Sequence, residues 1–248
     1  NPIINGTGID FEIKEGNCDL EGWVHRANLK CPCCGSITDV RQIKEQALNN
    51  TWSKKMIGVI EEGEKGKTYR LPRQDEVDIV STVPYSERPT ETMQRNSAGG
   101  DTFSWGVTKW GQLYSRRQLF AIKTLVQKLE NIKSELQPEN NEYDKALVTY
   151  LGIWIDRIAV VNTSFGRWNV SGEKVETPFS KQAIPMIFDY PESNMFCDST
   201  GSARNQLQWI LKYINSESKT PFFSICNHAA SGEKEQFEAK SLTAVITD

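Results

Sequence analysis

Hydrophobic positions recur at helical spacing in three stretches of this chain. In residues 115–134 the apolar side chains on one arc are Leu119, Ile122, Leu125, Val126 and Leu129. Steps of three and four residues place such side chains on one side of a helix. The same spacing returns in residues 143–161 and after Ser202, and Ser115 and Ser202 are suitable N-cap residues for the first and third runs. We therefore predict three amphipathic helices.

Residues 1–84 have shorter patterns. Apolar and polar residues alternate in residues 9–13 and 56–60, and glycine and charged residues separate these pieces. Residues 61–67 read Glu-Glu-Gly-Glu-Lys-Gly-Lys and are suited to a hairpin connection. The pattern predicts a small lobe rich in strands and loops.

The intervening and final stretches complete the predicted organisation. Residues 85–104 have no apolar periodicity and contain proline, serine and glycine, so we expect a linker before a mainly helical region at 105–215. Residues 216–248 end in an apolar, β-branched run followed by Asp248. Such a run predicts a buried parallel strand that returns to a sheet and carries a carboxylate to its C-terminal edge, where open α/β sheets bind ligands. The expected fold class is α+β.

Composition limits the class of protein. The chain has 248 residues, 38% hydrophobic and 25% charged, which is typical of a globular protein. No apolar run approaches the roughly 20 residues that cross a bilayer, and the first residues do not resemble a signal peptide, so we expect a cytoplasmic protein without a membrane partner. A net charge of −3 excludes a uniformly basic protein but not a local basic face.

The cysteines indicate a metal-binding turn. Cys31 and Cys34 have the C-x-x-C spacing of a zinc knuckle, and Pro32 and Gly35 favour the tight turn that two thiolate ligands need. This supplies half of a tetrahedral site. The remaining ligands would be Cys18, Cys33 or His25, or would lie outside the chain. The alternative is a set of reduced structural thiols.

A basic helix face is the first candidate for binding nucleic acid. Residues 102–129 contain five basic residues and no acidic one, and Arg116, Arg117 and Lys123 lie opposite the apolar arc of the first helix. This face either contacts phosphates or is an ordinary solvated helix surface.

Several stretches, taken in order, resemble the adenine-specific DNA methylases that contain a zinc ribbon. They read Cys-Pro-Cys-Cys-Gly at 31–35, Gly-Lys-Thr-Tyr-Arg-Leu-Pro at 66–72, Trp-Gly-Gln-Leu-Tyr-Ser-Arg-Arg-Gln-Leu at 110–119, Asn-Thr-Ser-Phe-Gly-Arg-Trp at 162–168, Gln-Ala-Ile-Pro-Met at 182–186 with Asp189 and Tyr190, and Ala-Val-Ile-Thr-Asp at 244–248. The resemblance is collinear over essentially the whole chain.

The resemblance implies a segment of a larger enzyme. The family's closing strand runs into an Asp-Pro-Pro-Tyr motif, so Asp248 would be its first, catalytic residue. The glycine-rich loop that binds S-adenosylmethionine and a second zinc knuckle would lie before Asn1. The chain would then be the internal segment of a Rossmann-like α/β methyltransferase, with a zinc-ribbon-like lobe, a helical DNA-recognition region and one returning strand. Alone it would be inactive.

The implied chemistry is methyl transfer to adenine N6. The nitrogen lone pair is delocalised into the ring, and an Asp carboxylate and a backbone carbonyl accept its hydrogens and localise it for attack on the methyl sulfonium. An aromatic ring stacks on the extruded base. This chemistry needs no metal, so bound zinc would be structural.

Residues around two loops complete the expected DNA contacts. Arg167 and Lys181 would join the helix residues in holding phosphates, Gln182 would read an adenine edge, and Trp168 would stack or wedge. For Arg167 and Gln182 the alternative is an internal hydrogen-bond network. We expect Asp189 and Glu192 to pair with these basic residues.

Two other functions fit the sequence. One is a non-catalytic nucleic-acid-binding module, which the basic face and the knuckle favour. The other is an interaction module of a restriction or phage-defence system that makes no DNA contact of its own.

Overall fold

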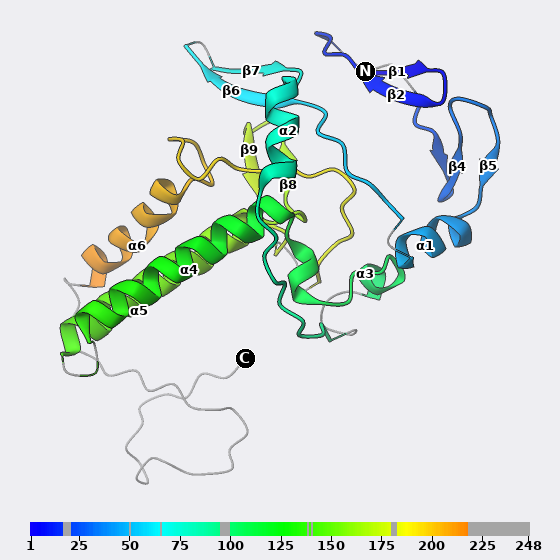
Figure 1. Ribbon diagram of the computed structural model, residues 1–248. Coiled ribbons are helices and arrows are strands. Elements are labelled where there is room, and N and C mark those ends of the chain that lie inside the picture. Colours follow the sequence, from blue (N-terminus) through cyan, green and yellow to red (C-terminus); the bar gives the residue numbers. More distant parts are fainter. Residues whose placement is uncertain are drawn as a thin grey trace, which may run out of the picture. The chain divides into compact units, whose positions relative to one another are not determined.

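The computed structural model describes residues 1–16, 21–49, 51–64, 66–94, 100–137, 139, 141–179 and 183–217. These residues form helices and small antiparallel sheets, so the expected α+β class is confirmed (Figure 1). The chain divides into two compact units, residues 1–211 and 212–248. Of the second unit, the described part is residues 212–217, the end of helix α6 (Ala203–Glu217).

Short strands make up much of the N-terminal region. Strands β1 (Pro2–Asn5) and β2 (Gly8–Phe11) form one hairpin, and strands β3 (Val24–His25), β4 (Asn28–Lys30) and β5 (Ile37–Thr38) form a three-stranded sheet. Strands β6 (Val59–Gly63) and β7 (Gly66–Arg70) form the hairpin that the charged connection predicted, with a shorter turn than expected.

Two short helices in this region were not predicted. Helix α1 (Val40–Leu48) begins after Asp39, whose carboxylate accepts hydrogen bonds from the amides of Arg41 and Gln42 at 2.7 and 3.0 Å. Helix α2 (Gln74–Thr82) begins after Arg73, where the Glu76 carboxylate accepts the Arg73 amide at 2.8 Å. Both starts use an acid or amide side chain to satisfy unpaired amides of the first turn.

The three long helices begin and end close to the predicted positions. Helix α4 (Arg116–Leu136) starts after Ser115, and helix α5 (Glu142–Val161) lies against it as the second arm of the green antiparallel hairpin in Figure 1. The indole Nε1 of Trp154 on α5 donates to the Ala203 carbonyl at 2.7 Å, which joins α5 to the start of α6. Trp154 therefore helps to hold α5 against the start of α6. None of the helices in the described ranges is both long and apolar enough to cross a membrane.

The central core collects residues from four parts of the sequence. Met93, Leu113, Phe165 and Ile184 are buried together. Leu113 ends the 3-10 helix η1 (Trp110–Leu113), and Met93 lies in the stretch expected to be a linker, which also contains helix α3 (Gly100–Ser104). The Met93 amide donates to the Thr108 carbonyl at 2.9 Å, so this part of the stretch is packed against the residues before η1.

Gly111 permits a close backbone approach in this core. A Cβ at this position would lie 2.4 Å from the Pro89 carbonyl oxygen. Arg88 fixes the same contact from the other side, because its Nη1 donates to the carbonyls of Gly111 and Tyr114 at 2.8 Å each. Glycine is therefore a packing requirement of the Trp-Gly-Gln-Leu segment.

Candidate nucleic-acid interface

The Leu113 carbonyl joins two of the segments that carry the family resemblance. It accepts hydrogen bonds from the Ser164 amide, the Ser164 hydroxyl and the Thr163 hydroxyl, each at 2.8 Å. Thr163 and Ser164 are both buried. The turn at residues 162–168 is therefore held against the end of η1, three residues before α4 begins.

The start of α4 contains buried polar atoms without partners. Gln118 accepts the Ser115 amide at 2.8 Å in a capping box, but its Nε2 has no partner among the described residues, although the side chain is only 1% exposed. The same holds for Oδ1 of buried Asn162, at the end of α5. A bound water or ligand group is the usual partner of such atoms.

Arg117 is engaged by an acid from a distant loop. Its Nε and Nη2 donate to the two carboxylate oxygens of Glu192 at 2.9 and 3.2 Å, and the Ser115 hydroxyl lies 3.2 Å from the same carboxylate. Glu192 thus balances a positive side chain placed at the positive end of the helix dipole. The pairing of Glu192 with a basic residue is as expected. Arg117 therefore has a structural role, because its guanidinium group is occupied by this ion pair.

Arg116 and Lys123 remain available for ligands. Both side chains are exposed. Arg116 makes no hydrogen bond or ion pair within the part of the chain that the structure describes, and Lys123 donates only to the neutral Glu87 carbonyl at 3.0 Å. The first turn of α4 has no acidic residue, whereas helices usually favour acids there. Glu192 pairs with Arg117, so the charge of Arg116 has no carboxylate partner among the described residues, and this favours an anionic ligand.

Arg167 belongs to an internal network on a hairpin that was not predicted. Strands β8 (Arg167–Asn169) and β9 (Lys174–Glu176) pair, and Glu176 accepts hydrogen bonds from Asn169 at 2.5 Å and from Arg167 at 2.6 Å. These contacts, the Asn169 bond first, lower the pKa of Glu176. Half-buried Trp168 lies opposite Val175. The geometry favours the network alternative for Arg167.

Sequence reasoning missed Asn169 and Glu176. The available signal was the pair of short polar and apolar runs on either side of Ser171-Gly172, which is typical of a hairpin. Lys181, Gln182 and Asp248, together with the predicted closing strand, lie outside the described residues. Asp189 is exposed and has no partner in the described ranges.

The cysteine turn connects β4 to β5. The Gly35 amide donates to the Cys31 carbonyl and the Cys31 amide to the Ser36 carbonyl, each at 2.8 Å, which closes the tight turn. The Ser36 hydroxyl lies 3.1 Å from the Cys34 sulfur. Hydrogen bonds from the Ser36 hydroxyl and amide, and then from Cys31, lower the pKa of Cys34. Loss of hydration and then the nearby Cys31 raise the pKa of Cys33.

The donor set of this turn is incomplete on the described residues. No group of three or more His, Cys, Asp or Glu side chains in the described ranges is arranged to hold a metal ion. Cys18 lies outside those ranges, and His25 is exposed on β3. Of the two cysteines with C-x-x-C spacing, Cys34 is the one whose pKa is lowered, which favours its thiolate.

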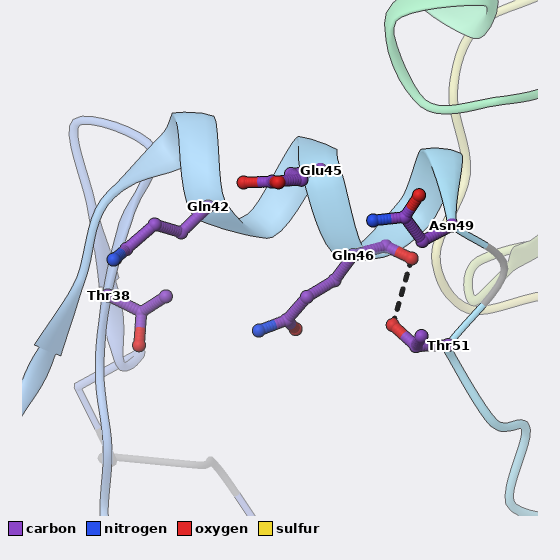
Figure 2. A pocket seen from close by; sticks show the side chains of 6 residues that line it. All are labelled: Thr38, Gln42, Glu45, Gln46, Asn49 and Thr51. Atoms are coloured by element: carbon purple, nitrogen blue, oxygen red, sulfur yellow. Dashed lines mark hydrogen bonds between the residues drawn. The ribbon is translucent and has the colours of Figure 1, made fainter.

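A separate polar pocket lies along α1 (Figure 2). Its volume is about 380 Å³, and its lining side chains are Thr38, Gln42, Glu45, Gln46, Asn49 and Thr51. The Thr51 hydroxyl donates to the Gln46 carbonyl at 2.9 Å and closes one end. Glu45, the charged residue of this lining, is exposed, so the pocket alone specifies no ligand.

Comparisons with protein-family models, with curated proteins and with solved structures return no match to this chain.

Proposed function

We propose that this chain is the internal, DNA-contacting segment of an S-adenosylmethionine-dependent DNA adenine N6-methyltransferase. The observation that carries the proposal is the meeting of the resembling segments in space. Residues 110–119, 162–168 and 183–186 contribute Leu113, Phe165 and Ile184 to one core. Segments that share one site in a family are expected to be neighbours in the folded chain, although about 50 residues separate the first two in sequence.

The proposed architecture extends the observed α+β fold. Residues 242–247 would add a strand to a Rossmann-like sheet whose other strands lie outside these residues. Cys31 and Cys34 would hold a structural zinc ion, with Cys18 or residues outside the chain completing the ligands. The lowered pKa of Cys34 supports this role, because the thiolate is the form that binds zinc.

The DNA contacts would centre on the start of α4. Arg116 and Lys123 would bind phosphates, because both are exposed and neither has a carboxylate partner in the described ranges. Arg117 would position the helix start through Glu192. Trp168, Lys181 and Gln182 would contact the DNA from the neighbouring loops, and Arg167 would contribute its exposed edge.

Asp248 would carry the chemistry of this segment. Its carboxylate would accept a hydrogen from adenine N6 and so raise the nucleophilicity of that nitrogen. S-adenosylmethionine, when bound, supplies the electrophilic methyl group.

The test uses the chain expressed within its complete reading frame. We expect transfer of labelled methyl groups to adenine in duplex DNA, and Asp248→Asn should abolish transfer while leaving DNA binding intact. Arg116→Gln with Lys123→Gln should weaken duplex binding and reduce the salt dependence of the binding constant by about 0.9 per lost phosphate contact. Lys145→Gln on α5 is the matched control. A folded, cofactor-binding protein that methylates no duplex contradicts the proposal.

A non-catalytic nucleic-acid-binding module is the second candidate. Arg116, which is exposed and has no partner among the described residues, favours it as well. DNA binding that depends on Arg116 and Lys123, without methyl transfer by the complete reading frame, would support this candidate over the first.

A further inference from the structure

Three aromatic rings from distant parts of the chain form one cluster. The rings of Trp52, Trp105 and Phe188 lie with centroids 5.5, 5.6 and 5.0 Å apart. The first two pairs are tilted, and Trp105 meets Phe188 edge to face. These are the arrangements that aromatic side chains prefer. We call these three residues the aromatic cluster.

The aromatic cluster is open on its outer side. Phe188 is 61% exposed and Trp52 is 38% exposed, so part of each ring is accessible to a ligand. At these centroid separations no planar ligand fits between the rings. A ligand would therefore lie on the exposed faces of Trp52 and Phe188.

Ammonium groups flank the aromatic cluster. Lys44 on α1 has its Nζ 5.2 Å from the Trp105 ring centroid, and the Lys54 Nζ lies 4.8 Å from the ring of Tyr190. Among the described residues neither ammonium has an ion-pair partner. Residues 40–58 contain four basic residues and one acid, Glu45, and Asp189 is the acid beside Phe188. The surroundings of the exposed rings are thus mainly positive.

The surroundings of Lys54 disfavour its charged form. Burial of its ammonium end and then the positive charge of Arg88 lower the pKa of Lys54, and Glu192 opposes this only in part. A phosphate group beside Lys54 would stabilise the charged form of this lysine.

We propose that the aromatic cluster is a stacking platform for unpaired bases of single-stranded DNA, with Lys44 and Lys54 binding the flanking phosphates. Exposed aromatic rings can stack on any unpaired base, and positively charged side chains beside the rings can bind the phosphates of the nucleic-acid backbone. A cationic ligand, the other group that aromatic clusters bind, is disfavoured because the Lys44 ammonium already lies against the Trp105 ring and the Lys54 ammonium against neighbouring Tyr190. The choice of DNA rests on the proposed function. The platform would hold bases released when a duplex is opened next to the methylated adenine.

The experiment measures binding of a fluorescein-labelled thymidine oligonucleotide of about 16 nucleotides to the 248-residue chain. Phe188→Ala and Trp52→Leu should each weaken binding roughly 5- to 100-fold, because each removes a stacking face. Phe196→Ala is the matched control, since Phe196 is exposed and lies outside the aromatic cluster. Lys44→Gln and Lys54→Gln should each reduce the salt dependence of the binding constant by roughly 0.7. Lys133→Gln should leave the salt dependence of the binding constant unchanged.

Two further readings separate the outcomes. Trp52 fluorescence should fall when the oligonucleotide binds, and a duplex of the same length should compete poorly. Unchanged affinity in folded Phe188→Ala and Trp52→Leu proteins, or equal binding of duplex and single strand, overturns the proposal. Tighter binding of an acidic peptide than of the oligonucleotide also overturns it. A different result is possible, in which these variants lose single-strand binding but the complete reading frame transfers no methyl group. That result would support the stacking platform and reject only the proposed methyltransferase function.

Discussion

Arg117 and Glu192 form a two-point ion pair across 75 residues of sequence, with donor–acceptor distances of 2.9 and 3.2 Å. Both side chains are about three-quarters buried, so the pair is shielded more than a surface ion pair and less than a core one. It connects the first turn of α4 to the loop that follows the aromatic cluster residue Phe188.

The Arg117–Glu192 pair should contribute measurably to stability. We expect Arg117→Gln and Glu192→Gln each to lower the free energy of unfolding by about 1–2 kcal/mol, with a coupling energy of about 1 kcal/mol in the double-mutant cycle. Denaturant unfolding measures all four proteins. The control is Arg204→Gln, which breaks an exposed pair with Asp198 and should cost less than about 0.5 kcal/mol. Additive single mutants would show that the pair carries no coupling.

The Arg70–Glu76 pair should make stability depend on pH in acid. Two hydrogen bonds from Arg70, at 2.8 and 2.6 Å, and then the Arg73 amide lower the pKa of Glu76 to about 2. Because the folded pKa is below the unfolded one, the stabilisation is complete above about pH 4.5 and is lost as the pH falls toward 2. The stability difference between the wild type and Glu76→Gln should therefore shrink over this interval.

Unfolding free energies from pH 2 to 7 measure this difference. Glutamine can still accept the Arg73 amide, so the helix cap is retained in the variant. Glu142→Gln is the control, because that carboxylate is exposed and 3.8 Å from its nearest lysine. A wild-type advantage that stays constant down to pH 2 would contradict the assignment.

Gly111 should not tolerate a larger residue. The added methyl of Gly111→Ala would lie 2.4 Å from the Pro89 carbonyl oxygen and 2.9 Å from its nitrogen, and both are backbone atoms that cannot rotate away. We expect a loss of about 3 kcal/mol in unfolding free energy, measured by thermal or denaturant unfolding. Gly152→Ala on α5 is the matched change, because its methyl would meet only Leu129 at 3.9 Å. That variant should be unchanged or up to about 1 kcal/mol more stable.

Cys34 should be the most reactive thiol of the turn in zinc-free protein. Its pKa is lowered by Ser36, whereas that of Cys33 is raised by lost hydration, so at neutral pH Cys34 holds the larger thiolate fraction. Iodoacetamide labelling followed by peptide mass spectrometry should show faster alkylation of Cys34. Ser36→Ala should lower the alkylation rate of Cys34 and leave the alkylation rate of Cys197 unchanged. Added zinc should protect Cys34, and equal rates for Cys33 and Cys34 would reject the assignment.

The long helices were predictable because their signals are local. Leu119 and its partners repeat at helical steps, and Ser115 caps the first turn. Helix α1 also has a local signal, the capping box of Asp39 and Gln42. This helix has only nine residues, so its apolar periodicity is too short to predict it. Short amphipathic helices carry few periods and are easily read as strand and loop.

The contacts that assemble the site were not predictable from local patterns. Met93 is one apolar residue in an aperiodic stretch, and it is buried only because Leu113, Phe165 and Ile184 come from elsewhere to surround it. Trp52 likewise has no neighbouring motif, and its relation to Trp105 and Phe188 depends on tertiary packing. The sequence predicts that Glu192 pairs with a basic residue. It does not indicate which of the nearby basic residues is the partner, and the structure shows that it is Arg117.

The Leu113 carbonyl also has a consequence for local motion. Three donors from Thr163 and Ser164 bind one oxygen, so the turn and the end of η1 open together or not at all. The Ser164 amide lies outside regular secondary structure, yet it should exchange with deuterium as slowly as amides in the middle of α5. A ligand that binds either the turn at residues 162–168 or the end of η1 would therefore also restrict the motion of the other segment, because there is no hinge between them.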